Sequence, residues 1–488
     1  MEQNEVIMLF NSMAFAIFLP IVFILYWVIP NKFRWIILLI SSYYFYMSWN
    51  LKFVFLILFT TVASYSAALL LEKQDDEKTK KLIIAIVLIV CLGILFVFKY
   101  FNFFSESLSS FAKLFAINLN TKTLDIIVPV GISFYTFQTL SYVIDVYRGD
   151  VSAEHHFGKY AAFISFFPQL VAGPIERTKN LLPQIKQEHK FDYEMASYGL
   201  KLMAWGFFKK LVVADNLSVH VDTVYQNINS YTGFSLVMAA FFFALQIYCD
   251  FSGYSDIAIG TANFFGIRLM TNFKSPYFSA SIKEFWSRWH ISLSTWFRDY
   301  VYIPMGGNRV SKPRHLFNVL VTFLVSGLWH GAQWTYVAWG GFHGAAQIVE
   351  GPFLTFEKNK ERKHTIFWWI RVLVVFVFCC LAWVLFRADN LSTAIYVYTH
   401  MLQGIGKFSE YISMGTKQLG IAKLEGNLLT LVISMLVIFD YLSLRRDMFI
   451  AVKKLPIIMR GILYIAVLLV IVILSPLDSA KEFIYFQF

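Results

Sequence analysis

Apolar runs long enough to cross a lipid bilayer recur along almost the whole chain, and they limit the fold more than any other feature. A helix needs about 20 apolar residues to span a hydrocarbon core of ~30 Å. Unpaired backbone groups are costly in lipid, so such runs fold as helices. The sequence therefore predicts an all-α integral membrane protein. The expected spans are 13–29, 33–49, 53–71, 82–98, 125–146, 200–215, 232–248, 250–266, 315–330, 333–350, 366–386, 427–443 and 459–475, with a shorter apolar piece at 160–173 that either crosses or re-enters the membrane.

The charge pattern supports this interpretation. Charged residues make up 15% of the 488 residues, whereas soluble domains contain about 25%. The net charge of +11 comes from Lys and Arg in short turns between apolar runs. The positive-inside rule explains such turns without a nucleic-acid partner. The acidic segment before the first span and the basic residues of 445–460 before the last span place both termini outside.

No soluble domain or long linker interrupts the apolar runs, which predicts a single membrane domain over 1–488. We expect peripheral helices up to about 124, a core over about 125–350 and further helices from 351 onward. The first run has no basic flank, so we expect a retained helix and not a cleaved signal peptide. The four cysteines have no metal-ligand spacing, so neither a disulfide framework nor a metal site is predicted.

Segment 284–304 is too polar for a lipid-facing helix, because it carries Arg288, His290, Arg298 and Asp299 among tryptophans. We expect it to lie inside the protein or to re-enter the membrane. Ionisable residues at membrane depth cost several kcal/mol unless they face a partner or a cavity, so they are functional candidates. They concentrate between Asp250 and His343.

The run SGLWHGAQWTYVAWGGFHG holds the first candidate, His330, at the end of an apolar stretch. Gly327 and Gly331 are four residues apart, and Gly340 and Gly344 repeat that spacing. Small residues at this spacing let two helices approach closely, which would bury His330 in a tight bundle. A neutral buried imidazole can accept a proton from a hydroxyl group.

The run EFWSRWHISLSTWFRDYVYIPMGGNR holds the second candidate, His290. If this run is one helix, Trp286, His290 and Phe297 share a stripe, while Arg288 and Ser292 lie on another. His290 would then sit between aromatic walls that suit a narrow substrate path. The closing 305–309 predicts a turn.

In the run QIYCDFSGYSDIAIG, Asp250 and Asp256 bracket a Ser-Gly pair that we interpret as a turn. Six residues apart, they do not share a helical face, which argues against a paired-carboxylate acid/base site. A role in accepting hydrogen bonds, or in pairing with arginines such as Arg288 or Arg298, is favoured over catalysis. An acyl-Cys249 intermediate is disfavoured, because the adjacent carboxylate opposes formation of a thiolate.

Each histidine also has a structural interpretation. A histidine at a helix end is more often a satisfied structural group than a catalyst, but the glycines and tryptophans around His330 favour function. His343 and His315 are assigned structural roles, and 155–156 is assigned to a solvated loop. The tryptophans crowd the polar stretches and favour a lined cavity over interfacial belts alone. They are Trp286, Trp289, Trp296, Trp329, Trp334 and Trp339.

Five blocks in order along the chain carry a family resemblance. They are VPVGISFYTFQTLSYVIDVYRGD at 128–150, FFPQLVAGPIER at 166–177, YCDFSGYSDIAIG at 248–260, the His290 run at 284–309 and the His330 run at 326–344, with IYFQF at 484–488 in addition. With them the chain resembles the membrane-bound O-acyltransferases, and their AlgI-like polysaccharide O-acetyltransferase branch more than their DltB-like branch.

The resemblance implies a multi-helix bundle with re-entrant segments around a central tunnel. It implies that His330 is the essential histidine and His290 the second histidine of the active site. The residues expected to line or support the tunnel are Trp286, Arg288, Trp289, Ser292, Arg298, Asp299, Asp250, Asp256, Trp329 and Trp334. We expect His330 to act as general base, and His290 to position the acceptor or to stabilise the oxyanion.

The resemblance also implies partners. Acetyl-CoA or another acyl thioester would donate from the cytoplasm, with no bound cofactor. An SGNH-type protein outside the bacterial cell membrane would complete transfer to a polysaccharide. Two alternatives stay open, namely D-alanyl transfer to teichoic acid and a transporter or flippase without enzymatic activity.

Overall fold

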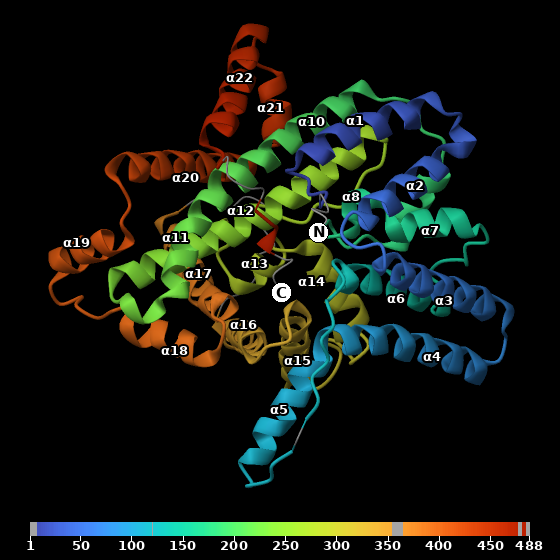
Figure 1. Ribbon diagram of the computed structural model, residues 1–488, viewed down its shortest axis with the longest axis horizontal. Helices are drawn as coiled ribbons and strands as arrows, with labels where there is room; N and C mark the ends of the chain where they lie inside the picture. The colour runs from blue at the N-terminus through green and yellow to red at the C-terminus, as the bar shows by residue number, and fades with distance from the viewer. Residues whose placement is uncertain (1–6, 120, 354–364, 477–480, 485–488) are drawn as a thin grey trace, which may run out of the picture. The chain divides into compact units, whose positions relative to one another are not determined.

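The computed structural model describes residues 7–119, 121–353, 365–476 and 481–484. Throughout these ranges the regular structure is helical, as predicted, and no strand occurs in them (Figure 1). The helices form two compact units. Unit 1 is Met1–Leu200 with Ile257–Met270, and unit 2 is Lys201–Asp256 with Thr271–Phe488.

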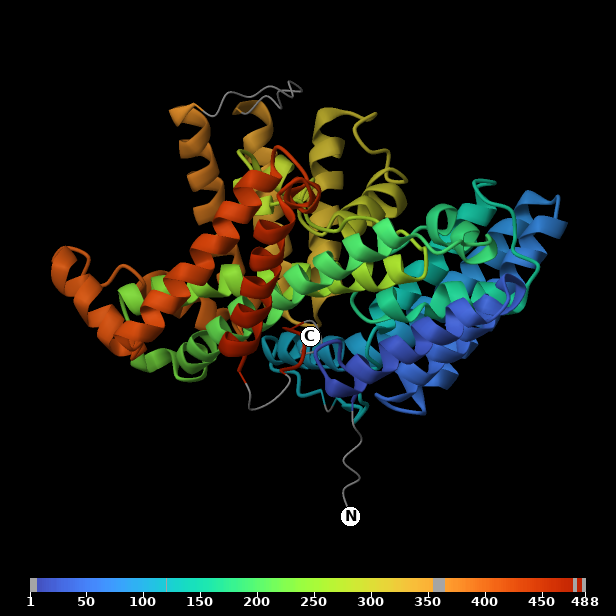
Figure 2. The ribbon, with the colours of Figure 1, turned by 90° about the horizontal axis from the view of Figure 1, so that it is seen from above.

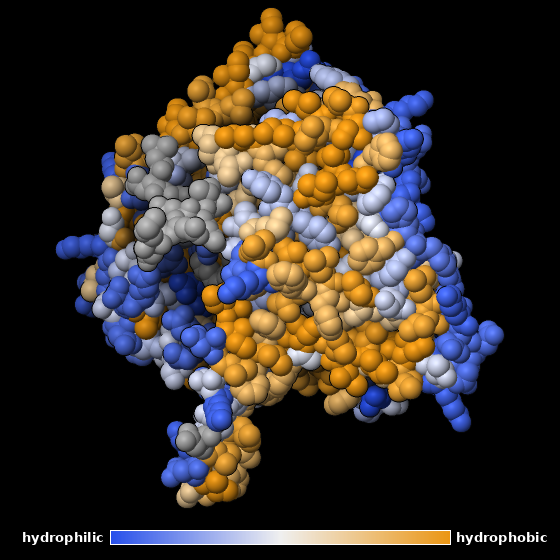
Figure 3. Space-filling view, turned by 45° about the vertical axis from the view of Figure 1, so that its right-hand side comes forward, coloured by the Kyte–Doolittle hydropathy of each residue, from blue (hydrophilic) through white to orange (hydrophobic). Residues whose placement is uncertain are grey.

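Among the described residues, six helices are long and apolar enough to cross a membrane. They are Phe53–Lys73, Glu77–Lys113, Phe234–Phe264, Ile366–Arg387, Lys423–Ser443 and Ile457–Leu474. The last of these buries no residue inside the protein, and broad apolar areas lie on the molecular surface (Figure 3). Exposed apolar surface on this scale is stable only against lipid. The chain is therefore a multi-pass membrane protein.

Unit 1 is organised around α6, a helix that is buried on every side. Its helices are α1 (Met13–Val28), α2 (Arg34–Met47), α3 (Phe53–Lys73), α4 (Glu77–Leu95), α5 (Phe101–Lys113), α6 (Ile132–Tyr147), α7 (Phe157–Ser165), α8 (Phe167–Leu170) and α9 (Thr178–Lys186). Gln138 is one of the polar side chains of α6 with partners inside the protein. Gln138 donates to the Phe163 carbonyl (2.8 Å) and accepts from Gln169 (2.7 Å).

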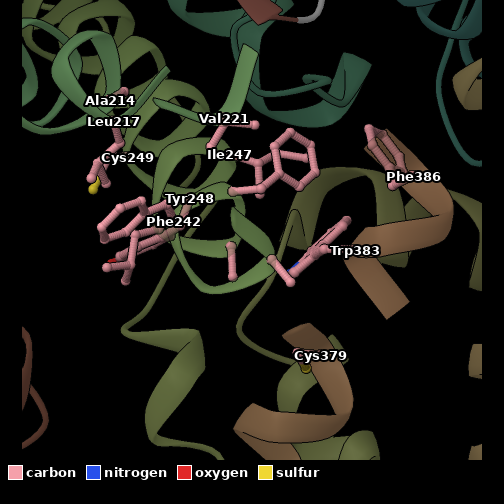
Figure 4. Packing of buried hydrophobic residues seen from close by; sticks show 14 of the residues in the cluster. Ala214, Leu217, Val221, Phe242, Ile247, Tyr248, Cys249, Cys379, Trp383 and Phe386 are labelled. Carbon is pink, nitrogen blue, oxygen red and sulfur yellow. The ribbon is translucent and has the colours of Figure 1, made fainter. Parts of the chain in front are cut away.

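Unit 2 is dominated by a large apolar and aromatic core. Its helices are the end of α10 (Tyr193–Phe207), α11 (Asp215–Gln226), most of α12 (Phe234–Phe264), α13 (Ile282–Trp286), α14 (Ile291–Phe297), α15 (Lys312–His330), α16 (Trp334–Phe353), α17 (Ile366–Arg387), α18 (Leu391–His400), α19 (Phe408–Leu419), α20 (Lys423–Ser443), α21 (Met448–Lys453) and α22 (Ile457–Leu474). Figure 4 shows Ile247 and Tyr248 of α12 in this core, with Trp383 and Phe386 of α17.

Two predicted span boundaries were wrong. The stretches 232–248 and 250–266, predicted as two spans, form the single 31-residue helix α12. Gly253 does not make a turn there, because its place is set by close packing. A Cβ atom at Gly253 would lie 2.7 Å from the Gly206 carbonyl oxygen. The predicted span 125–146 is helical only from Ile132, because Gly131 before it has a left-handed φ of 75°.

Candidate active site

His330 is the last residue of α15, at the turn into α16, and is 3% exposed. The glycines predicted to bring two helices together do so here. A Cβ atom at Gly327 would lie 2.2 Å from the Tyr336 carbonyl oxygen, and one at Gly340 would lie 2.2 Å from the Phe323 carbonyl oxygen. The α15–α16 pair therefore packs backbone against backbone, and α17 runs beside it (Figure 2).

This contact makes a direct prediction about two adjacent glycines of α16. Gly340→Ala should destabilise the folded protein by about 1–3 kcal/mol, because the added methyl group meets backbone that has no room to move. Gly341→Ala is the matched control, since its Cβ atom would meet only a Leu324 side chain at 3.4 Å. Thermal unfolding of the detergent-solubilised variants checks this. Equal unfolding temperatures for the two variants would contradict the packing.

Aromatic rings and a second histidine surround the His330 ring. The centroid distances from His330 are 5.0 Å to Trp329, 5.0 Å to Trp339, 5.2 Å to Phe386 and 6.5 Å to His290. The side chains come from α15, α16, α17 and the segment before α14. Two imidazoles thus lie close together in a dry, aromatic part of unit 2, where electrostatic interactions are strong.

His290 is completely buried and precedes α14 in a left-handed conformation, with φ 42° and ψ 54°. A non-glycine residue in this region is strained and persists only where its surroundings hold it. Asn272 supplies that support, because its carbonyl oxygen accepts from the Ile291 amide at 2.9 Å. The break at His290 means that 284–304 is not one helix, so the predicted stripe of Trp286, His290 and Phe297 was wrong.

The side chain of Asn272 also fixes the tautomer of His290. Asn272 Oδ1 lies 3.1 Å from His290 Nδ1, 3.2 Å from the Ser292 amide and 2.9 Å from Ser292 Oγ. A backbone amide can only donate, so the atom it meets is the oxygen of Asn272. His290 Nδ1 therefore carries the proton, and Nε2 of the neutral ring is the basic nitrogen.

Removing this acceptor should impair the function of His290. Asn272→Leu should slow the acyl transfer expected from the sequence about 10–100-fold, the range known for partners that orient metal-ligating histidines. Asn272→Asp keeps an acceptor oxygen and should recover part of the loss. Transfer rates of the purified variants check this, with thermal unfolding as the control for folding. Equal rates for the leucine and aspartate variants would contradict a role through the tautomer.

Three lysine–aspartate contacts and one lysine–serine hydrogen bond form a buried charge cluster in unit 2. Lys210 Nζ lies 2.6 Å from Asp250 and 2.8 Å from Asp215, and Lys209 Nζ lies 2.6 Å from Asp256 and 2.9 Å from Ser252 Oγ. Asp250 accepts a hydrogen bond, as one of the two predicted roles required, but the prediction of arginine partners was wrong, because Asp250 and Asp256 pair with lysines. The sequence signal for the true partners was the pair of lysines inside the apolar stretch 200–215, since a lysine there needs an acid.

The predicted arginines pair locally instead. Arg288 binds Glu284 at 2.7 Å, and Arg298 binds Asp299 at 2.7 Å. The Arg298 side chain is 58% exposed and Trp334 is 55% exposed. These two residues and Asp299 therefore do not belong to the buried site. Arg298 and Asp299 lie in the π-helical turn after α14, and Trp334 is the first residue of α16.

The remaining predicted residues lie at or near the two histidines. Trp329 contacts both rings, Ser292 shares Asn272 with His290, and Trp286 and Trp289 are buried in the adjoining aromatic cluster. The walls around His290 come mainly from Phe251 and Phe273, with centroids 4.6 and 6.3 Å from its ring. Sequence spacing had not indicated either phenylalanine.

The last described residues reach the same neighbourhood. The Ile484 amide donates to Asp250 at 2.8 Å, and the Phe483 ring lies 4.5 Å from Tyr254 and 5.8 Å from Phe251. Phe251 in turn contacts His290. Of the family-like block 484–488, only Ile484 lies within the described residues.

The site can act on protons. No group of three metal-ligating side chains occurs in the described ranges. A neutral imidazole in an apolar pocket can take a proton from a hydroxyl group and return it to a leaving group. His343, assigned a structural role from sequence, accepts from the Trp286 indole (3.3 Å) and packs among aromatic rings.

Comparison with known proteins identifies the family that the chain resembles. The model of the membrane-bound O-acyltransferase family matches residues 151–388, which contain both histidines. The chain is 40% identical to the probable alginate O-acetylase AlgI of Pseudomonas putida, over 81% of this chain and 80% of that protein. It is 35% identical to the peptidoglycan O-acetyltransferase of Helicobacter pylori over the same shares. Identity to the teichoic acid D-alanyltransferase of Streptococcus thermophilus is 33%, over 48% of this chain and 60% of that protein.

Proposed function

The chain belongs to the membrane-bound O-acyltransferase family, and we propose that it moves an acetyl group from a cytoplasmic thioester, acetyl-CoA, to a polysaccharide outside the cell membrane. That it is a membrane O-acyltransferase follows from its relatives. The observation that carries the finer proposal is the pair of buried imidazoles, with ring centroids 6.5 Å apart, among aromatic side chains.

His330 acts as the general base in the proposed reaction. It takes the proton of an acceptor hydroxyl while the hydroxyl oxygen attacks the thioester carbonyl. The C–O bond forms, the C–S bond breaks, and the leaving thiolate receives the proton from the His330 imidazolium. Base catalysis of this kind contributes about 10²–10⁴-fold to the rate. Exclusion of water by the aromatic walls protects the thioester from hydrolysis.

His290 positions the acceptor in this scheme. Asn272 holds the proton of the neutral ring at Nδ1, so Nε2 can accept a hydrogen bond but not donate one. This favours the binding of a hydroxyl donor at Nε2 over stabilisation of an oxyanion. A hydroxyl group has a single proton and His330 takes it, so Nε2 of His290 accepts from a neighbouring hydroxyl group of the acceptor.

The direction of transfer is supported by the helix ends. The helix α15 begins among Arg309, Lys312 and Arg314, and basic residues at 358–363 separate α16 from α17 in the sequence. The positive-inside rule places these ends in the cytoplasm. Over 19 residues α15 rises about 28 Å, so His330 lies far from the cytoplasmic end. A donor from the cytoplasm must therefore reach inward through a passage, which is the proposed tunnel, and the acceptor side is the outer one.

The partners in this proposal are an extracytoplasmic SGNH-type protein and the polysaccharide that it modifies. Acetyl is favoured over D-alanyl because the match covers 80% of the Pseudomonas putida acetylase at 40% identity, but 60% of the Streptococcus thermophilus D-alanyltransferase at 33% identity. The experiment is to hydrolyse the cell envelope of strains with and without the protein and to identify the released acid. Acetate lost with the protein supports the proposal, and D-alanine lost instead would overturn the acetyl assignment.

A further inference from the structure

The helix α5 and the chain that follows it are joined by an unusual set of hydrogen bonds. Asn102 donates to the Leu124 carbonyl (2.9 Å) and accepts from the Leu124 amide (2.8 Å). Ser105 donates to the Lys122 carbonyl at 2.9 Å, and Ser109 to the Leu119 carbonyl at 3.3 Å. The polar face of α5 thus holds the backbone of the return segment 121–128, and the two form a hairpin.

The opposite face of α5 is a stripe of large apolar side chains that the protein leaves uncovered. Phe104, Leu108 and Phe111 follow at helical spacing and are 45%, 55% and 59% exposed, and Phe115, in the turn after α5, extends the stripe and is 64% exposed. The helix projects away from α3, α4 and α6 of its own unit (Figure 1). Apolar residues cover one side of the same projection at the lower edge of Figure 3. A stripe this large requires an apolar neighbour.

The stripe continues a surface that already faces lipid. Leu82, Ile86, Ile89 and Leu92 are exposed apolar residues of α4, within the membrane-spanning stretch Glu77–Lys113. Phe96, in the π-helical turn Phe96–Tyr100, stacks on Phe104 at 5.6 Å and joins the two stripes. The helix changes direction at this turn, as π-helical insertions commonly cause. The lipid-facing surface of α4 is therefore continuous with the exposed apolar stripe of α5.

Charge and hydrogen bonding favour lipid over a protein partner. Glu106 and Lys113 of the helix cancel, as do Lys122 and Asp125 of the return segment, so the hairpin offers no net charge for a charged partner. In lipid, backbone N–H and C=O groups need hydrogen-bond partners within the protein. Asn102, Ser105 and Ser109 provide such partners for part of the chain that follows α5. Amphipathic helices with aromatic apolar faces typically lie in the boundary between headgroups and acyl chains.

We propose that the hairpin of 101–119 and 121–128 lies in the interfacial layer of the bilayer, with the stripe of Phe104, Leu108, Phe111 and Phe115 inserted among the acyl chains. In this position the hairpin does not project into water, and it attaches this part of unit 1 to the membrane surface. This surface is separate from the histidine site and does not depend on the proposed reaction.

Depth-dependent quenching tests the proposal on the full-length protein. Phe111→Cys is labelled with an environment-sensitive thiol dye and reconstituted into phosphatidylethanolamine/phosphatidylglycerol vesicles. Glu106→Cys, on the opposite face of α5, is the matched control, and the unsubstituted protein reports labelling of its four native cysteines. Nitroxide lipids labelled just below the headgroup should quench the dye at position 111. Aqueous iodide should quench the dye at position 106 and spare position 111.

Two outcomes would overturn the proposal. Quenching at position 111 by iodide and not by nitroxide lipid would place the stripe in water. Quenching at position 111 by neither would mean that protein, a second copy or a partner, covers the stripe. Leu108→Cys gives a second reading of the same stripe if the Phe111 variant fails to fold.

Discussion

Replacing His330 with alanine is expected to slow acetyl transfer about 10²–10⁴-fold while the protein still folds into the membrane. The loss follows from removing the base that takes the hydroxyl proton. Folding should be retained because His330 is the last residue of α15, and alanine favours helix at that position. The measurement is the acetate released from envelope polysaccharide by mild alkali, alongside the amount of protein in the membrane.

His315→Ala is the control for this variant. It makes the same substitution in the same helix, at a histidine that hydrogen-bonds Tyr302 at 2.9 Å and lies in the first turn of α15. Acetylation should stay near the wild-type level in the control. An unchanged acetate content in His330→Ala, with normal protein in the membrane, would contradict the base role of His330.

Replacing Lys210 with methionine is expected to destabilise the protein by about 3–5 kcal/mol, the cost of breaking a buried ion pair by removing one partner. Lys210 is 5% exposed and touches both Asp215 and Asp250, which are 4% and 3% exposed. Without it, two buried carboxylates lose their common counter-charge. The loss should appear as a lower unfolding temperature and as less protein in the membrane.

Lys423→Met is the matched control for Lys210, because Lys423 is an exposed lysine in the same unit. Exposed lysines contribute at most about 1 kcal/mol through charge. A double variant, Lys210→Met with Asp215→Asn, removes one of the two uncompensated charges and should recover part of the stability. If Lys210→Met and Lys423→Met unfolded at the same temperature, the charge cluster would not hold the fold together.

The sequence predicted the features that depend on local spacing. The glycines at 327 and 340 indicated a close helix pair that buries His330, and the packing confirms it, since a Cβ atom added at either glycine would lie 2.2 Å from a backbone carbonyl oxygen. The apolar runs indicated the all-α membrane fold, and the motifs indicated the family. Each of these signals lies within about twenty neighbouring residues, where helical periodicity makes positions predictable.

The features that sequence analysis missed depend on contacts between distant residues. Asn272 reaches His290 across 18 positions, and Lys210 pairs with Asp250 across 40. No periodicity links such pairs. The left-handed His290 was equally hidden, because glycine is the usual residue at such a φ value and the sequence has none there. The error over Trp286 and Phe297 followed from this, since the assumed helix breaks at His290.

The central claim is that His330 and His290 form one acetyl-transfer site, and the most direct test is a double-mutant cycle in reconstituted vesicles. The rate of label transfer from acetyl-CoA to an acceptor polysaccharide is measured for the wild type, His330→Ala, His290→Ala and the variant lacking both. Residues that act as a unit are strongly non-additive, so the double variant should be no slower than His330→Ala by more than a small factor. Wild-type rates in either folded single variant, or losses that multiply in the double variant, would contradict a shared site.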